Sequence, residues 1–325
     1  MYRYVLKRLL LMIPVLLGIS FVIFGLMSLS PGDPARMILG ESASMEDVLA
    51  LQEEMGLNDP FLVRYFTYVA NMLKGDFGVS YTFRIPVFDA IGPLIPSTVK
   101  LALGSLFIMV IFGIPIGILS AVKKYTWIDT VSLMGALFLT SMPAFWLGLM
   151  LILLFALKLH WLPSMGVDSF KNYILPCVTL AAGMMANLVR MTRSSMLEVL
   201  KQDYIRTARA KGATERVVIY KHALRNALMP IITVVGLNFG SMLGGAVVVE
   251  SVFAMPGLGT LIISSVRMKD TPLVVASVLL VAFFAGMVNL VVDVLYAYVD
   301  PRIKSRYAVS RGLKRREKAK EAAAQ

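Results

Sequence analysis

The chain has 325 residues, of which 58% are hydrophobic and only 16% are charged. This composition excludes an ordinary soluble domain, in which about 25% of the residues are charged. The formal net charge of +12 would suit a nucleic-acid-binding protein. However, the basic residues gather between long apolar runs, which excludes nucleic acid as a partner and indicates a chain that lies in a lipid bilayer.

Six apolar runs are long enough, or nearly long enough, to form the roughly 20-residue helix that crosses a bilayer core of about 30 Å. They cover residues 9–29, 101–122, 130–157, 174–189, 228–249 and 274–298. The run at 174–189 is the shortest. None of them has Lys or Arg in its central part. We therefore predict an all-α polytopic membrane protein with six transmembrane helices.

The distribution of basic residues predicts how these helices are oriented. With the N-terminus in the cytoplasm, 23 of the 32 Lys and Arg residues fall on the cytoplasmic side and 9 fall outside. This asymmetry favours a plasma-membrane protein with both termini in the cytoplasm.

The N-terminal part combines a transmembrane helix with a large extramembrane segment. Residues 1–30 give the cytoplasmic N-terminus and the first helix, whose apolar run is longer than the roughly 7–15 residues of a signal peptide. Residues 31–98 hold 9 acidic and 4 basic residues, and we predict an external helical subdomain there. Ser44 is expected to cap a helix over 45–55 that Gly56 ends, and a second helix is expected over 61–73.

Residues 99–300 form a predicted core of five transmembrane helices, followed by a basic cytoplasmic tail over 301–325 that could bind anionic lipid. Pro143 lies inside the third predicted helix, where proline can cause a kink. Pro176 is expected to open the fourth. Between the fourth and fifth helices lies a basic cytoplasmic loop at 190–226.

This loop contains the most distinctive pattern of the chain, at 199–222. Apolar residues recur at helical spacing on both sides of Gly212, which predicts two short amphipathic helices joined by a glycine turn. The residues that define the spacing are Leu197, Leu200, Tyr204 and Ala208 before the glycine, and Val217, Tyr220, Leu224 and Leu228 after it. The alternative is a basic loop that only follows topology rules, with Gly212 as a helix cap.

Sequence resemblance favours a coupling role for this loop. Residues 204–212 and 222–227 resemble the "EAA" loop of ATP-binding-cassette (ABC) importer permeases, in the form seen in the dipeptide/oligopeptide/nickel branch. Arg206 and Arg225 stand where other branches place Glu and Pro, which argues against a sugar or amino-acid permease. Further matching stretches are 30–34, 56–57, 75–78, 193–197, 256–259 and 300–302.

The resemblance implies a type I ABC importer permease architecture in a bacterial or archaeal plasma membrane. Its implied partners are a second homologous permease, two ATPase subunits that bind ATP and Mg²⁺, and an extracytoplasmic substrate-binding protein. Di- or oligopeptides are the first expected cargo, with nickel, glutathione or another small solute as alternatives. The residues implied to contact the ATPases are Tyr204, Arg206, Ala208, Lys211, Gly212 and Glu215.

Two further groups of residues are candidates for the transport pathway. Gly236, Gly240 and Gly244 recur at every fourth position of the fifth helix, a spacing that lets another helix approach closely. That neighbour could belong to the same subunit or to a partner across the pathway. Asn238 and Asn289 complete this packing or pathway group. By resemblance, Pro256, Gly257 and Gly259 belong to an external re-entrant segment that caps the pathway.

The absence of certain residues limits the mechanism. Ion-coupled carriers usually place an ionisable side chain inside the membrane, whereas here Glu250 and Asp293 lie near predicted helix ends. The chain has no Gly-Lys dipeptide and therefore no phosphate-binding P-loop. Cys177 is the only cysteine, and the two histidines are far apart in sequence.

We therefore expect no catalytic residue, cofactor or metal in this chain, and a separate motor. An ATP-independent channel or carrier, a membrane enzyme and a structural scaffold are the remaining alternatives.

Overall fold

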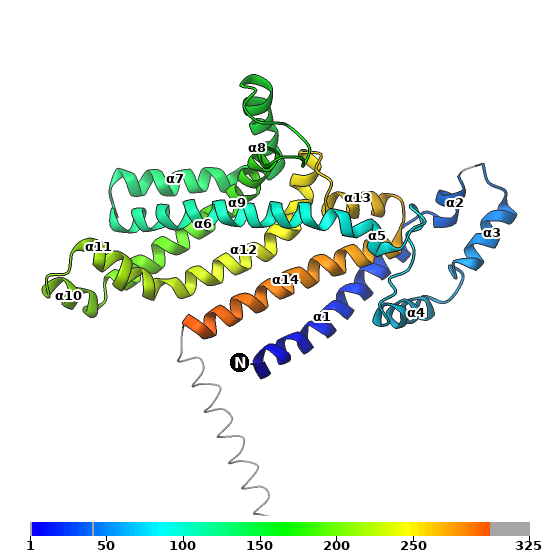
Figure 1. The fold of residues 1–325 in the computed structure, drawn as a ribbon, viewed down its shortest axis with the longest axis horizontal. Helices are drawn as coiled ribbons and strands as arrows, with labels where there is room; N and C mark the ends of the chain where they lie inside the picture. Colours follow the sequence, from blue (N-terminus) through cyan, green and yellow to red (C-terminus); the bar gives the residue numbers. More distant parts are fainter. Residues whose placement is uncertain (1, 41, 300–325) are drawn as a thin grey trace, which may run out of the picture.

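The computed structural model describes residues 2–40 and 42–299, with side chains over 5–40 and 42–294 (Figure 1). Regular structure in these ranges is helical, apart from one isolated β-bridge between Val79 and Pro86. The predicted tail and the matching stretch at 300–302 lie outside the described residues.

Among the described residues, five helices are long and apolar enough to cross a membrane. They pack side by side and form the body of the molecule (Figure 1). The five are α1 (Tyr2–Leu29), α6 (Ile95–Val122), α9 (Phe170–Leu200), α12 (Leu224–Val252) and α14 (Thr271–Val299). Two are longer than predicted, because α5 (Val87–Ile91) and the turn Gly92–Leu94 lead directly into α6, and the chain is helical from Glu215 onward into α12.

The third predicted helix, over 130–157, is not a single straight helix. It consists of α7 (Trp127–Ser141) and α8 (Ala144–Leu151), which continues as π-helix over Ile152–Lys158. The two parts meet at an angle of 101°. Met142 is extended at φ −84°, ψ 127° because the residue before a proline is driven out of the helical region. Counting this bent pair as one span gives six spans, the number predicted from the apolar runs.

The expected start of the fourth helix at Pro176 is also wrong. A capping box formed by Ser169 and Asn172 begins α9 at Phe170, so that Pro176 lies inside the helix. Proline removes one backbone hydrogen bond near the N-terminus of α9, a loss that the remaining turns of this 31-residue helix tolerate.

Within the described residues, the most extensive contact between two helices is that of α6 with α9. A Cβ atom on Gly113 would lie 2.9 Å from Leu188, and one on Gly117 would lie 2.8 Å from the carbonyl oxygen of Val189. These glycines therefore allow the two backbones to approach closely. Helix α12 packs against both α9 and α6, and the buried core runs between these three helices.

The 31–98 subdomain projects from the opposite end of the molecule to residues 203–217 (Figure 1). It contains α2 (Pro34–Leu39), α3 (Met45–Glu54) and α4 (Phe61–Leu73). As predicted, Ser44 caps α3 by accepting a 3.1 Å hydrogen bond from the Asp47 amide, and Gly56 has φ +63° just after it. Tyr65 of α4 donates to the carbonyl oxygen of Leu17 at 3.0 Å, which fixes the subdomain to α1.

Candidate functional site: the 199–222 turn and the Glu250 network

The 199–222 segment forms a protruding turn at one end of the bundle (Figure 1). After α9 ends, α10 (Asp203–Ala210) leads to Gly212, whose φ of +80° is the left-handed conformation expected of a glycine turn. The chain returns through α11 (Glu215–Val217) and a π-helical stretch, Val218–Ala223, into α12. We call residues 203–217 the knob.

The prediction of two independent short helices was only half right. The first, α10, exists, but Leu197 and Leu200 belong to the end of α9. Residues Leu224 and Leu228 belong to α12, because no residue between Glu215 and Val252 interrupts the helix. The knob is therefore one short helix, the glycine turn and the first helical turn (α11) of the continuous helix that leads into α12.

An ion pair closes the knob across its glycine. Arg209 Nε lies 2.7 Å from Glu215 Oε1, and Arg209 Nη2 lies 3.2 Å from Glu215 Oε2. This contact raises the pKa of the Arg209 guanidinium. Glu215 was predicted to contact a motor, whereas Arg209 was not singled out. A fork-to-fork pair fixes geometry more than it adds stability when both side chains are exposed.

The other predicted contact residues have different environments. The Tyr204 residue is 44% exposed and the Arg206 side chain is 77% exposed. Lys211 and Gly212 are also exposed, while Ala208 is half-buried against the core. Ile205 is fully buried and anchors α10 to the bundle. The outward surface of the knob is therefore mainly charged.

Behind the knob lies a bidentate ion pair that the sequence did not reveal. Arg193 of α9 contacts both carboxylate oxygens of Asp129 at 2.7 Å. Asp129, only 4% exposed, also accepts hydrogen bonds from Ser120 Oγ at 2.5 Å and from the Tyr125 amide at 3.0 Å. The end of α6, the start of α7 and the C-terminal part of α9 are thereby joined. In the sequence, Asp129 was only an acidic residue beside a predicted span, and Arg193 only the first residue of a matching stretch.

At the opposite end of α12, Glu250 organises the predicted re-entrant segment. It is 1% exposed, and its Oε1 accepts a 2.5 Å hydrogen bond from Thr98 of α6. Its Oε2 accepts from the amides of Gly259 at 2.8 Å and Thr260 at 3.2 Å. The hydroxyl of Thr98 in turn accepts from the Leu258 amide at 2.9 Å. These contacts define the Glu250 network.

The Glu250 network explains two of the three residues predicted in this segment. Gly257 and Gly259 are buried against the carboxyl group of Glu250, and a Cβ atom on either would overlap it or the backbone of Val247. Pro256 is exposed. The segment continues as α13 (Leu258–Arg267), a short apolar helix that returns the chain to α14.

The predicted glycine stripe of α12 divides into two environments. A Cβ atom on Gly236 would overlap Val292 of α14, whereas none of the described residues comes within 4 Å of such an atom on Gly240 or Gly244. The open glycines adjoin an uncovered face of α12. Its exposed members are Leu237, Ser241, Gly244 and Val248.

The two predicted asparagines also lie in different places. Asn238 is buried in the core, where its amide donates to the carbonyl oxygen of Met184 at 3.4 Å. Asn289 lines a cleft of about 210 Å³ between α1 and α14. Asp293 lines the same cleft and pairs with Arg8 at 3.0 Å. Within the described residues, no group of three His, Cys, Asp or Glu side chains could hold a metal ion.

Comparisons with known proteins identify the family. Residues 113–305 match the family described as "Binding-protein-dependent transport system inner membrane component", and residues 1–102 match its N-terminal family. The chain is 43% identical to the dipeptide transport system permease protein DppB of Alkalihalophilus pseudofirmus, over 94% of this chain and all of that protein. It is 45% identical to the glutathione transport system permease protein GsiC of Escherichia coli K12, over 94% and 99%.

The fold has been observed before. An inward-facing structure of the MetNI methionine ABC transporter superposes with a TM-score of 0.54, at 20% identity, over 62% of this chain and 93% of that chain. The matched families, the two permease relatives and the shared fold lead to one conclusion. The chain belongs to the binding-protein-dependent transport system inner membrane component family and is a membrane-embedded permease subunit of an ABC importer.

Proposed function

We propose that this permease imports short peptides and that partner ATPases drive it through the knob. The observation that carries the proposal is the position of the knob between α9 and α12. The buried side chain of Ile205 in α10 and that of Val218, the residue directly after the knob, hold it there. A displacement of the knob must therefore move the ends of two long helices, because these packed contacts leave α10 little freedom of its own.

The far ends of the same helices reach the Glu250 network. Helix α12 carries Glu250, and α9 packs along the full length of the core against α6, which carries Thr98. ATP binding would drive transport by favouring one arrangement of the knob over another. A ligand that binds two states equally well does not shift the equilibrium between them.

The remaining assignments complete the complex. Both termini and the knob lie in the cytoplasm, and the 31–98 subdomain lies outside, where a substrate-binding protein delivers cargo. A second permease faces the uncovered side of α12 and encloses the pathway with it. Two ATPase subunits bind ATP and Mg²⁺, so this chain needs no catalytic residue, cofactor or metal of its own.

The names of the relatives support a peptide cargo, since one is a dipeptide permease and the other a permease for glutathione, itself a tripeptide. Nickel or another small solute is the alternative within the same branch. An uncoupled channel or carrier is the alternative from a different class.

Reconstituted uptake tests the proposal. Proteoliposomes containing both permeases and both ATPases would be supplied with a labelled di- or tripeptide, with ATP and the binding protein each added or withheld. Uptake that requires both components is expected. ATP hydrolysis that the binding protein stimulates, without peptide uptake, would contradict the proposed peptide cargo. Solute movement without ATP would contradict the proposed coupling of transport to ATP.

A further inference from the structure

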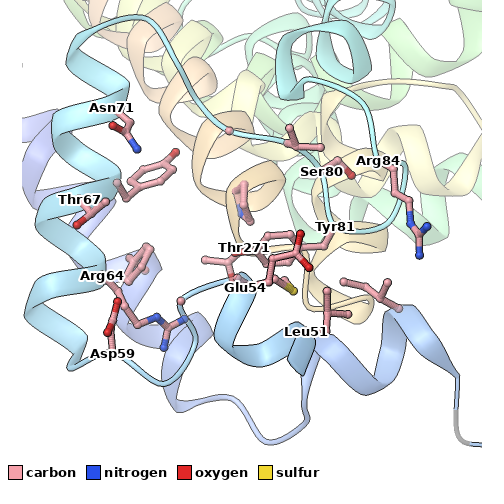
Figure 2. Close-up of a pocket in the computed structure, with 18 of the residues that line it drawn as sticks. Leu51, Glu54, Asp59, Arg64, Thr67, Asn71, Ser80, Tyr81, Arg84 and Thr271 are labelled. Atoms are coloured by element: carbon pink, nitrogen blue, oxygen red, sulfur yellow. The ribbon is translucent and has the colours of Figure 1, made fainter. Parts of the chain in front are cut away.

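The 31–98 subdomain and the start of α14 form a cavity of about 790 Å³ that is open to one side (Figure 2). Its walls come from α3, α4, the loop over 78–84 and Thr271 of α14. Ligand sites in proteins commonly have volumes of about 300–1,000 Å³. The cavity lies at the opposite end of the molecule to the knob and apart from the uncovered face of α12.

One wall of the cavity is fixed to the transmembrane bundle. Asp270, which is fully buried, accepts a hydrogen bond from Ser80 Oγ at 2.5 Å and another from the Thr82 amide at 3.0 Å. Ser80 Oγ also accepts from the Phe83 amide at 3.0 Å. These bonds hold the loop that carries Tyr81 and Arg84, so this wall is formed before any ligand arrives.

Charged groups of both signs line the cavity: Glu54, Asp59, Arg64 and Arg84. Within the described part of the chain, no ion pair joins any of these four side chains to a partner. In Figure 2, Glu54 lies near the centre of the cavity, with Arg64 on one side and Arg84 on the other. The Arg64 guanidinium carbon also lies 5.8 Å from the centroid of the Phe24 ring. Among the described residues, no ion pair therefore competes with a ligand for the two carboxylates and the two guanidinium groups.

Two tyrosines add neutral hydrogen-bonding groups. The hydroxyl of Tyr68 is buried and has no hydrogen-bond partner among the described residues, an arrangement that costs free energy unless a ligand or water satisfies it. Burial raises the pKa of Tyr68 and of Tyr81, while the positive charge of Arg64 opposes the shift at Tyr81. Both therefore stay protonated at neutral pH and can donate a hydrogen bond.

We propose that this cavity binds a short peptide in its zwitterionic form, at a site separate from the translocation pathway. The carboxylate end pairs with Arg64 or Arg84, the ammonium end pairs with Glu54 or Asp59, and Tyr68 bonds a polar group between them. A simple anion would face Glu54, and a simple cation would face the arginines. The inference rests on the proposed function in one respect, that short peptides are delivered to this face.

The test is calorimetric titration of L-trialanine into the purified permease–ATPase complex without the binding protein. One saturable site is expected. N-acetylation or C-terminal amidation should each weaken binding by about tenfold, since each removes one charge-assisted contact. These analogues act on the unaltered protein, so the result does not depend on the folding of a variant. Equal binding of trialanine and its doubly blocked form would overturn the proposal.

Matched substitutions locate the site. Glu54→Gln and Arg64→Gln should each weaken trialanine binding by about tenfold. Glu53→Gln and Lys74→Gln change the same charges on exposed neighbours outside the cavity and should leave binding unchanged. If all four variants bind equally, the cavity is not the site.

The result of this binding experiment can be distinguished from the result of the transport assay. Suppose that the cavity variants lose trialanine binding, but the unaltered complex shows no ATP-driven peptide uptake. This result would contradict the proposed peptide cargo of the importer and would still support the cavity site. Uptake of peptide by a complex that shows no such binding would overturn the cavity site alone.

Discussion

Glu250 and Thr98 lie 152 positions apart in the sequence, yet their side chains meet at 2.5 Å in the buried end of the helix bundle. Through this contact α6, α12 and the segment at 256–259 become one unit. The carboxylate also accepts backbone amide hydrogen bonds from Gly259 in that segment and from Thr260 directly after it. The predicted re-entrant segment is therefore held by Glu250 together with Thr98, whose hydroxyl accepts from the Leu258 amide.

Replacing Glu250 with Gln should weaken this unit. An amide group has only one acceptor oxygen, so at least one of the three donors loses its partner, at a cost of about 1–3 kcal/mol for a buried group. We expect a lower melting temperature of the purified complex and leakage of peptide without ATP. The matched control is Ser251→Ala, which removes an exposed hydroxyl next in sequence. Equal melting temperatures of the two variants would contradict the role of Glu250.

Glycine substitutions along α12 should differ in their effect on stability according to whether the glycine is packed against a neighbour. Gly236→Ala places a methyl group against Val292 and should lower the melting temperature, because overpacking costs about 1–3 kcal/mol. Gly244→Ala meets open space and should leave the melting temperature unchanged. Gly244→Leu should keep assembly but reduce uptake, if this face lines the pathway. Normal uptake by that variant would argue against the assignment.

Removing one member of the Asp129–Arg193 pair should be more costly than removing both. Asp129→Asn leaves Arg193 largely buried without its charge partner, and breaking such a pair costs about 3–5 kcal/mol. We expect low yield of folded protein from this variant. The double variant Asp129→Asn with Arg193→Gln should recover part of the loss, which a double-mutant cycle on melting temperature would measure. Strictly additive effects would show that the two residues do not interact.

The Arg209–Glu215 pair should affect coupling more than stability. Both side chains are exposed, and isolated surface pairs add little stability. Arg209→Glu should therefore leave the melting temperature nearly unchanged while lowering the number of peptides imported per ATP hydrolysed. The exchange Arg209→Glu with Glu215→Arg should restore part of that ratio. A ratio that stays normal in the single variant would show that the closed turn is not needed.

Local patterns in the sequence predicted several parts of this structure well. Ser44, Gly56 and the span of α4 over 61–73 follow from capping and periodicity, and Gly212 from its place between two polar helical segments. The 101° bend before Pro143 could not be predicted in size, since membrane helices often tolerate proline without breaking. Neither could the partners of Glu250 and Asp129, because they come from other helices and leave no local pattern.

The glycines show the same limit. The regular spacing of Gly236, Gly240 and Gly244 predicted one close helix contact, but of the three only Gly236 meets a neighbour within the described part of the chain. The tightest glycine contacts between long helices include those of α6 with α9. The whole arrangement of helices decides which face of a helix meets which neighbour. The spacing of glycines alone therefore cannot predict that contact.

The most direct test of ATP-driven coupling through the knob compares Gly212→Val with Gly75→Val. Both glycines have positive φ, +80° and +88°, and a Cβ atom added to either would have none of the described residues within 4 Å. The two changes therefore impose similar backbone strain at opposite ends of the molecule. The measurement is peptide uptake and ATP hydrolysis stimulated by the binding protein, in complexes shown to contain every subunit. Loss of both in Gly212→Val, with both retained in Gly75→Val, is expected. Normal uptake by an assembled Gly212→Val complex would contradict coupling through the knob.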